Sequence, residues 1–467
     1  MLVRRCYDER LAQASYLIGC QSTGEAIVID PARNIAPLLD AARQEGVHIT
    51  LITETHIHAD FVSGSRELAA ATEAEILLSA EGGEDWQYRY PAADAIRLLH
   101  DGDVVRIGAV QVTVLHTPGH TPEHLAFLIT DLARSTDPVA LVSGDFLFVG
   151  DVGRPDLLEE AAGMARSKEP SARELFRSLQ RLAPLPDYLQ VWPGHGAGSA
   201  CGKALGALPT STLGYERRTN WAFQTTDEAT FVAAVLEGQP PAPTYFARMK
   251  CVNRDGPAVL GHRPAPVALP ASAFQAALRD GVVVDTRPLQ AYADGHITGT
   301  LNIPLIRAFT TWAGWLLPSD RPLYLIAADP AAARDAQLAL ASIGLDAVAG
   351  AFGPEVIAAA RHHGTIHATR RAPMADAPDL QHAGRLVVDV RDLGEWRAGH
   401  VEDAVHHPLG NLSHTLASLD RATPLAVHCE GGTRSAIAAS VLESMGFDDV
   451  IDMPDGWAGR EQVTANK

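Results

Sequence analysis

Two stretches of this chain, residues 282–304 and 386–408, repeat the same pattern. In each copy an apolar run ends in an aspartate, an arginine follows two positions later, and a Gly-His pair comes after a polar segment. The shared positions, 104 apart, are Asp285, Arg287, Gly295 and His296 in one copy and Asp389, Arg391, Gly399 and His400 in the other. Such a run before helical segments is typical of a buried parallel strand in an α/β domain. We therefore predict a duplicated α/β domain, with copies at 269–365 and 376–467.

The length and composition of the chain limit what the rest of it can be. At 467 residues there is room for about three domains with separate cores. Lysine and arginine total 38 against 56 acidic residues, a net charge of −18 that argues against a nucleic-acid partner. The sequence has no apolar run of about 18 residues and no signal-peptide core, so no membrane association is expected and a cytoplasmic location is predicted. Five scattered cysteines predict reduced thiols. A homo-oligomer is expected, because soluble enzymes often form symmetric ones.

Residues 1–245 are predicted to form one domain of short β-rich runs and a few helices. "VHITLITET" predicts a strand that leads into a loop, and "GSRELAAATEA" predicts the helix that follows. "DVVRIGAVQVTVLH" alternates apolar and polar residues around Gly108, which predicts a hairpin. The segment 246–268 is rich in proline and glycine and is predicted to be a linker.

Histidine and aspartate side chains follow four apolar strands of this first domain. In "THIHADF", His56 and His58 alone are weak evidence for a metal site, because two histidines near a strand end are often ordinary loop residues. His120 in "TPGHT", Asp145 in "SGDFLF" and His195 in "PGHG" stand in the same context. A carboxylate at the end of an apolar strand needs a partner. Four strand ends that each deliver a ligand-type side chain predict a metal site.

These motifs, together with "GDVGRPDL" and "PGHGAGSACGKALG", resemble the metallo-β-lactamase superfamily and, within it, the persulfide dioxygenases. The resemblance implies an αββα sandwich and one non-haem Fe(II) per chain, held by His56, His120 and Asp145, with His58 nearby. It also implies that a small persulfide such as glutathione persulfide reacts with O₂ to give sulfite. Arg154, in "GDVGRPDL", is a candidate for binding a substrate carboxylate, although a structural role is an equal alternative.

Position 61 favours one metal ion over two. A second ion would need Asp60, the residue at 61 and His195, with Asp145 shared, but Phe61 has no donor atom. Two histidines and one carboxylate with open positions form the triad suited to Fe(II) and O₂. Asp60 and His195 are then expected close to the metal without binding it. A zinc-dependent thioester hydrolase of the glyoxalase II type remains the alternative. Cys201 is expected to be a buried apolar side chain, with a reactive thiol as the alternative.

The second copy of the repeat contains a reactive-cysteine motif. In "LAVHCEGGTRSAIAAS" a strand ends at Cys429 and a helix follows a tight loop. Inward-facing loop amides and the helix N-terminus stabilise a thiolate or an anion, and Arg434 can bind an oxyanion. The spacing also fits C-x₅-R phosphatases formally, but "CEGGTRS" and the upstream "VDVRDLGEWRAGH" resemble rhodaneses, the sulfurtransferases. Catalysis is therefore assigned to Cys429 and Arg434. Substrate binding is assigned to the remaining loop residues, Glu430, Gly431, Gly432, Thr433 and Ser435.

The first copy lacks these groups, because Ala327 aligns with Cys429 and Ala332 with Arg434. It is predicted to be an inactive rhodanese-like domain with a structural or docking role. The combined prediction is a fused enzyme that oxidises a persulfide to sulfite and moves sulfane sulfur through Cys429 between persulfide, sulfite and thiosulfate. A sulfur-carrier or sensor scaffold without catalysis is the non-enzymatic alternative.

Overall fold

The computed structural model describes residues 1–160, 167–203 and 205–459, which form two compact units. The first unit contains Met1–Arg263 with Ala341–Gly344, and the second contains the remainder from Pro264. The end of the predicted domain 376–467, residues 460–467, lies outside the described residues. Both predicted copies of the α/β repeat thus belong to the second unit.

Two six-stranded sheets form the centre of the first unit. The first sheet has the order β1 (Leu2–Asp8), β2 (Gln13–Cys20), β3 (Glu25–Ile29), β4 (His48–Thr53), β5 (Glu75–Ser79), β6 (Ile96–Leu99). The second has the order β12 (Ser211–Thr212), β11 (Gln190–Pro193), β10 (Ala140–Gly144), β9 (Leu125–Asp131), β8 (Val110–His116), β7 (Val104–Ile107). The predicted hairpin at Gly108 is confirmed, because β7 and β8 pair antiparallel from Ile107 opposite Val110.

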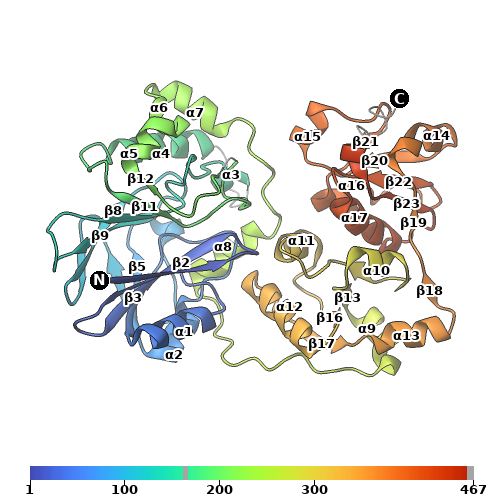
Figure 1. The fold of residues 1–467 in the computed structure, drawn as a ribbon, viewed down its shortest axis with the longest axis horizontal. Coiled ribbons are helices and arrows are strands. Elements are labelled where there is room, and N and C mark those ends of the chain that lie inside the picture. The colour runs from blue at the N-terminus through green and yellow to red at the C-terminus, as the bar shows by residue number, and fades with distance from the viewer. Residues whose placement is uncertain (161–166, 204, 460–467) are drawn as a thin grey trace. The chain divides into compact units, whose positions relative to one another are not determined.

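The two sheets face each other across an apolar core, and helices cover both outer faces (Figure 1). Ile27 of the first sheet and Phe127 of the second belong to one fully buried cluster between the sheets. Helices α1 (Ala36–Glu45) and α2 (Ser65–Thr72) pack on the first sheet, and α4 (Lys168–Gln180) and α7 (Glu228–Leu236) pack on the second. Shorter helices are α3 (Leu157–Glu160), α5 (Leu213–Thr219) and α6 (Trp221–Gln224). The predicted αββα sandwich is confirmed.

Residues 246–255 form helix α8 (Phe246–Asp255), where the sequence predicted the start of a linker. Phe246, Met249 and Asn253 are buried in the first unit. The prolines and glycines that suggested a linker lie mostly after Asp255, so they end this helix without preventing it. The first domain therefore extends at least to the end of α8.

Each repeat of the second unit has its own parallel sheet. The first has the order β15 (Leu301–Asn302), β13 (Val282–Asp285), β16 (Leu323–Ile326), β17 (Val348–Phe352). The second has the order β19 (Arg370–Arg371), β23 (Val450–Met453), β22 (Leu425–His428), β20 (Leu386–Asp389), β21 (Val405–His406). Apart from the added β19, the two orders are equivalent, so the repeat in the sequence is a repeat of the fold.

Helices flank both sheets, and a short two-stranded ladder joins β14 (His296–Ile297) to β18 (Ile366–His367). The helices of the first repeat are α9 (Phe274–Asp280), α10 (Leu289–Ala293), α11 (Phe309–Leu316), α12 (Pro330–Ser342) and α13 (Glu355–His362). Those of the second are α14 (Ala377–His382), α15 (Leu393–Ala398), α16 (Leu412–Thr415) and α17 (Thr433–Ser444). Leu301 of the first repeat packs against the core of the second, and Ser440 of α17 accepts a hydrogen bond from Asn302 N at 3.0 Å. The two repeats share packing within one unit.

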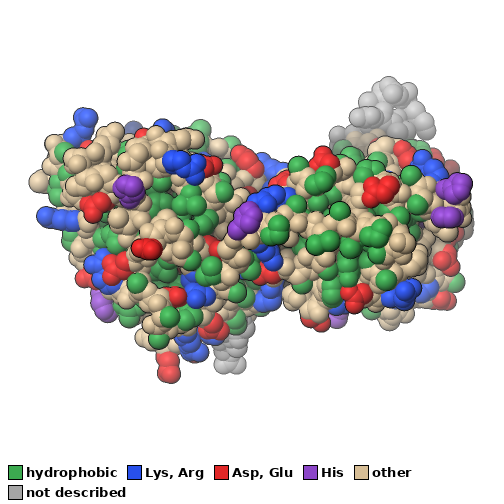
Figure 2. Space-filling model, turned by 90° about the horizontal axis from the view of Figure 1, so that it is seen from below, with side chains coloured by type: hydrophobic (Ala, Val, Ile, Leu, Met, Phe, Trp, Pro, Cys, Tyr) green, Lys and Arg blue, Asp and Glu red, His purple; other side chains and the backbone are tan. Residues whose placement is uncertain are grey.

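Charged side chains of both signs are scattered over the surface drawn in Figure 2. On the face drawn in Figure 2, lysine and arginine side chains lie singly or in small groups among acidic and uncharged ones. Among the described residues, no helix combines the length and apolar character needed to cross a bilayer.

Candidate metal centre and cysteine loop

The side chains of His56, His120 and Asp145 meet at one edge of the two sheets, with donor atoms within 4.8 Å of one another. Each follows a strand, as predicted, because it stands in the loop after β4, β8 or β10. Asp145 Oδ2 lies 3.6 Å from His120 Nε2 and 4.0 Å from His56 Nε2. All three side chains are buried, with exposures of 3% or less.

The chemistry of these atoms fits a bound metal ion. Both carboxylate oxygens of Asp145 and Nε2 of His56 are buried without a hydrogen-bond partner among the described residues. Burial, together with the charges of neighbouring histidines, lowers the pKa of His120 to about 3 and that of His56 well below its ordinary value. Burial also raises the pKa of Asp145. Neutral imidazoles and a carboxylate with no cation beside it are a ligand set whose cost of burial a metal ion offsets.

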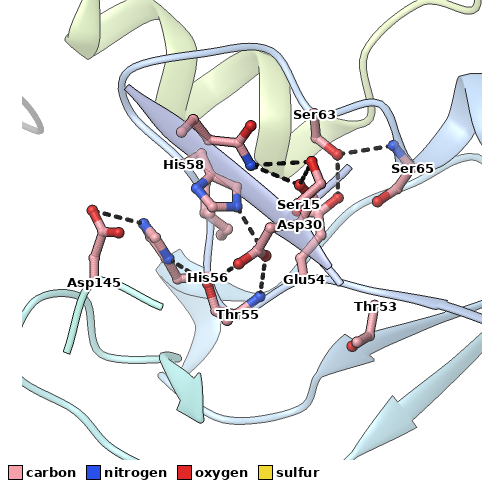
Figure 3. Close-up of polar contacts among 12 residues, drawn as sticks. Ser15, Asp30, Thr53, Glu54, Thr55, His56, His58, Ser63, Ser65 and Asp145 are labelled. Atoms are coloured by element: carbon pink, nitrogen blue, oxygen red, sulfur yellow. Dashed lines mark hydrogen bonds and ion pairs between the residues drawn. The ribbon is translucent and has the colours of Figure 1, made fainter. Parts of the chain in front are cut away.

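A chain of hydrogen bonds orients His56. Thr55 Oγ1 lies 2.9 Å from His56 Nδ1 and donates to Asp30 Oδ2 at 2.9 Å. This arrangement leaves Nε2 of His56 directed at Asp145 (Figure 3). Asp30 ends strand β3 in the left-handed region, with φ of 51°, a conformation that aspartate tolerates better than most residues. Such outer contacts fix the rotamer of a metal ligand.

His58 turns away from this centre. Its Nε2 lies 3.1 Å from Asp30 Oδ1, and Figure 3 shows the ring directed at that carboxylate. Although burial alone would lower it, the contact with Asp30 raises the pKa of His58 to about 9. An imidazolium has no lone pair for a metal. The buried ring of Phe61 packs on His58, with ring centroids 4.3 Å apart, and provides no donor atom.

His124 binds the backbone amide of Asp145. Its Nε2 accepts a hydrogen bond from Asp145 N at 3.1 Å, and its Nδ1 lies 2.8 Å from Thr117 Oγ1. Gly144, with φ of 51°, permits this approach because a β-carbon there would lie 2.7 Å from His124 Nε2. The backbone before Asp145 is therefore fixed by a buried histidine that is not itself a candidate ligand.

A second donor set adjoins the first. Atoms of Asp60, His195 and Cys201 lie within 4.8 Å of one another, and all three residues are buried. His195 Nε2 is 3.3 Å from Asp60 Oδ2 and 3.5 Å from Asp145 Oδ1, while its Nδ1 donates to Ala12 O at 3.1 Å. Burial raises the pKa of the Cys201 thiol well above its ordinary value. The structure therefore places this thiol among ligand-type groups, a more specific environment than the apolar one expected.

The partners of Arg154 belong to the fold itself. Arg154 is fully buried, and its guanidinium forms an ion pair with Asp156 at 2.6 Å. The remaining N–H groups donate to Ala200 O at 3.0 Å and Pro240 O at 2.7 Å. Because these partners use its donors, Arg154 connects three loops of the fold, which corrects the predicted contact with a substrate carboxylate.

Helix α8 binds the loop after β4, which carries His56. Asn253 Nδ2 donates to His58 O and Phe61 O, both at 2.7 Å, and its Oδ1 accepts from Ser63 N at 2.9 Å. Three backbone groups of one loop thus depend on a single buried amide.

In the second unit, Cys429 lies between β22 and α17 and is 1% exposed. Gly432 N donates to Cys429 Sγ at 3.1 Å. Gly432 has φ of 88°, and a β-carbon there would collide with Pro454 O, so the turn requires glycine. Ser435 Oγ donates to Gly432 O at 3.1 Å. The predicted loop from Glu430 to Ser435, with Gly431 and Thr433 between, turns beside the sulfur and enters α17 at Thr433.

Arg434 is held beside this loop by Glu395, at 2.6 Å for both nitrogen–oxygen pairs. Although burial opposes it, this contact raises the pKa of Arg434 above its ordinary value. Glu430 instead pairs with Arg391 at 3.1 Å, and its side chain is 45% exposed. Arg434 can therefore bind an oxyanion only if it shares or exchanges its carboxylate partner.

The equivalent loop of the first repeat is shorter and has no thiol. Strand β16 ends at Ile326 and α12 begins at Pro330, whereas β22 ends at His428 and α17 begins at Thr433. Ala327 is buried after β16, and Ala332 N donates to Asp329 Oδ1 at 2.8 Å.

Comparisons with known proteins agree with this geometry. The profile of the Metallo-beta-lactamase superfamily matches residues 8–195. A hydroxyacylglutathione hydrolase of Cereibacter sphaeroides is 30% identical over 234 residues, which cover 50% of this chain and 78% of that protein. One of Rhodospirillum rubrum is 37% identical over 180 residues, 38% of this chain and 60% of its own length. The chain belongs to the metallo-beta-lactamase superfamily.

One solved structure is similar to this chain beyond the N-terminal sandwich. A solved structure described as a metallo-beta-lactamase from Staphylococcus aureus is 42% identical, with a TM-score of 0.68, and covers 76% of this chain and 99% of its own. The Rhodanese-like domain profile matches residues 374–461, the second repeat. A metallo-beta-lactamase fold is therefore followed by a rhodanese-like domain that contains Cys429.

Sequence reasoning missed two residues that support the metal centre of this metallo-beta-lactamase fold. Asp30 ends the apolar run "EAIVID" and carries the same signal as Asp145, so it was open to prediction. His124 stands two residues after a proline in a loop, and only the contact with Asp145 N identifies its role.

Proposed function

We propose that the N-terminal domain is a persulfide dioxygenase with one Fe(II) per chain, held by His56, His120 and Asp145. Glutathione persulfide or a similar small persulfide, O₂ and water would give the thiol and sulfite. Bound Fe(II) would supply the activation of O₂, which two histidines and one carboxylate with open positions support. Zinc hydrolysis of a thioester is the alternative.

The observation that carries this proposal is the state of the motif at 55–61. A dinuclear site would use five donor positions, which are 56, 58, 60, 61 and 145. Phe61 provides no donor atom, and His58 is in contact with Asp30. His56 therefore remains as the histidine of this motif that faces Asp145. This leaves one set of two histidines and one carboxylate in place of two complete metal sites. Such a set favours oxygen chemistry over hydrolysis.

The residues around the triad have defined tasks. Thr55 and Asp30 hold His56 so that Nε2 stays directed at the metal position. Ala12 O fixes the proton of His195 on Nδ1, so Nε2 is left as a proton acceptor beside the triad. His195 is thus placed to take the proton of a persulfide or of water.

The hydrolase alternative has an observation of its own. Asp60, His195 and Cys201 form a second donor set next to Asp145, and a thiolate is a strong zinc ligand. If Cys201 replaces the donor lost at Phe61, two zinc ions would fit, and the relatives named hydroxyacylglutathione hydrolase would indicate the reaction class.

The two functions are separated by metal content and substrate. Protein purified without oxygen should hold one iron per chain at this centre and consume O₂ with glutathione persulfide. His120→Ala or Asp145→Ala should lose both the iron and the O₂ uptake. Cys201→Ser serves as the matched variant, because it should lower metal content only if the second set binds an ion. Two zinc ions at this centre with turnover of S-lactoylglutathione would reject the dioxygenase.

For the second unit, we propose that Cys429 accepts sulfane sulfur and transfers it to sulfite. The thiolate takes the outer sulfur of a persulfide and releases the thiol, and sulfite then attacks that sulfur, giving thiosulfate and restoring the thiolate. Support comes from the turn around Sγ and from the match to rhodanese-like domains. The first repeat, with Ala327 in place of the cysteine, is proposed to be an inactive copy.

A further inference from the structure

A third group of ligand-type side chains lies in the second unit, away from Cys429. His296, His367 and Glu443 come from β14, β18 and α17, and their donor atoms lie within 4.8 Å of one another. His296 and His367 stand opposite each other in the two-stranded ladder. The three residues thus bring together the first repeat, the segment between the repeats and the long helix of the second repeat.

The contacts within this group are close without being hydrogen bonds. Glu443 Oε2 lies 3.1 Å from His296 Nε2, and Glu443 Oε1 lies 3.6 Å from His367 Nε2. His296 is 1% exposed and Glu443 8% exposed. Even so, Oε2 of Glu443 has no hydrogen-bond partner in the described part of the chain. A buried carboxylate oxygen without a partner is costly unless a cation is bound to it.

The proton of His296 is already assigned to its other nitrogen. Nδ1 lies 3.1 Å from Tyr292 O, and a carbonyl oxygen can only accept, so Nδ1 carries the hydrogen. In the neutral ring, Nε2 then presents a lone pair to Glu443. Two acceptors at this distance repel each other, so the contact requires a positive charge, carried either by a second proton on Nε2 or by a metal ion that both atoms bind.

We propose that His296, His367 and Glu443 bind one zinc ion. Zinc binds histidine nitrogen and carboxylate oxygen at about 2.0–2.2 Å in a tetrahedron, which places neighbouring ligand atoms about 3.3–3.6 Å apart. The two histidines approach different oxygens of Glu443, at 3.1 and 3.6 Å, and one donor atom from each residue lies within 4.8 Å of the others, so a small shift of these side chains brings three donors to one ion. His367 is 48% exposed, so the site opens to solvent on its side and water can complete the coordination.

Outer contacts hold these ligands as they do in other metal sites. Thr369 Oγ1 donates to Glu443 Oε1 at 3.1 Å, and Tyr292 O fixes the tautomer of His296. Each of these two contacts orients a ligand side chain toward the position that the three side chains share.

The second repeat provides an internal control for this site. Its equivalent histidine, His400, also places Nδ1 3.0 Å from a carbonyl four residues earlier, that of Trp396, and stacks on that ring at 3.7 Å. Stacking on an aromatic ring is therefore a property of the repeat, and Tyr292 does the same for His296 at 4.0 Å. His400 is exposed and belongs to none of the metal-type groups of the described residues. Of these two equivalent histidines, only His296 lies beside a carboxylate and another histidine.

Zinc at this position would connect the repeats through α17, whose first turn closes the Cys429 loop. The ion would be structural, since it joins an element of each repeat and lies at the opposite end of α17 from the cysteine.

The test is zinc content of the full chain after removal of metal and dialysis against Zn²⁺. Wild-type protein should retain one more zinc per chain than His367→Ala, a variant chosen because this half-exposed side chain can be removed without opening the core. The same difference should appear in the Asp145→Ala background, which separates it from the N-terminal centre. His400→Ala should retain as much zinc as the wild type.

A second measurement covers variants that fold poorly. Co²⁺ in place of Zn²⁺ should give visible absorption typical of nitrogen and oxygen ligands in the Asp145→Ala protein, and Glu443→Gln should abolish it while preserving the contact with Thr369. Equal zinc retention by wild type, His367→Ala and Glu443→Gln would show that the three side chains form an ion pair only, and the proposal would then be rejected.

Discussion

In the second repeat, strand β22 leads to Cys429 and a glycine turn that donates an amide to its sulfur, whereas the equivalent strand β16 of the first repeat leads to Ala327 and a loop that ends at Pro330, where α12 begins. The sheets are otherwise equivalent in strand order. The Asp–Arg pair that marks both copies in the sequence is also equivalent. Asp285 binds Arg287 at 2.6 Å and Asp389 binds Arg391 at 2.7 Å.

The Asp–Arg pair occurs in both copies and the cysteine in one, so the pair belongs to the fold and the cysteine to the proposed chemistry. In each copy the arginine also donates to a glycine carbonyl eight residues later, Gly295 O at 3.1 Å or Gly399 O at 2.7 Å. The pair therefore fixes the turn after the strand whether or not a thiol is present. The same framework therefore forms in a copy with the cysteine loop and in a copy without it.

The largest expected effect concerns Cys429. Cys429→Ser should reduce sulfur transfer to sulfite below detection, because hydroxyl oxygen cannot carry sulfane sulfur. Oxygen uptake with glutathione persulfide should stay within about twofold, since the cysteine belongs to the other compact unit. Thiosulfate formation and O₂ consumption measured on the same sample would check this, with the exposed Cys251→Ser as control. Loss of O₂ uptake would mean that the persulfide reaches the metal on Cys429.

The second prediction compares the two Asp–Arg pairs. Arg391→Ala should destabilise the protein by about 3–5 kcal/mol, because it removes the arginine that pairs with the buried Asp389 carboxylate. It also removes a contact with the Trp457 ring at 4.5 Å. Arg287, whose side chain is 15% exposed, should cost less when replaced by alanine. Urea unfolding of both variants measures the difference, and equal losses would contradict the distinction.

The third prediction concerns Asp452, which occurs in the second repeat alone. Val427 pairs with Asp452 in β23, whereas the equivalent Leu325 pairs with Ala351 in β17. Burial, opposed by a contact with Ser435, raises the pKa of Asp452 to about 6. The folded state therefore binds this proton more tightly than the unfolded state, and stability is lost as the pH rises from about 4 to about 6.

Asp452→Asn should accordingly stabilise the protein above pH 6 by up to about 3 kcal/mol, from a shift of about two pH units at roughly 1.4 kcal/mol each. It should have little effect at pH 4. Denaturant midpoints at both pH values measure the change. A uniform effect across this range would show that ionisation of Asp452 is not its cause.

The smallest expected effect is that of Ala327→Cys in the first repeat. A thiol alone should not restore transfer, because the following loop is shorter and contains Asp329 in place of the glycine turn. Thiosulfate formation by Ala327→Cys in the Cys429→Ser background should remain at the level of Cys429→Ser. Measurable transfer there would show that the cysteine, and not the loop, is the deciding difference.

The sequence predicted the features that follow from periodicity and strand ends. Asp145 and His120 could be placed together because the loops after β8 and β10, which run in the same direction on either side of β9, meet at one edge of the sheet. Cys201 could not, because it follows no strand and only the folded loop brings it to Asp60. Arg154 illustrates the converse error. Its residue type suits a carboxylate ligand, but packing of three loops, which no local pattern reports, determines its partners.

The amide of Asn253 links the metal centre to the order in which the chain is made. Its partners, His58 O and Phe61 O, precede it by 195 and 192 residues. The ribosome therefore releases the loop "THIHADF" long before the helix that closes it, and contacts of such long range form late in folding. A nascent chain that has reached only the end of β11 contains His56, His120 and Asp145 but lacks α8. The loop that carries His56 can therefore reach its final hydrogen-bonded geometry only after α8 has been made.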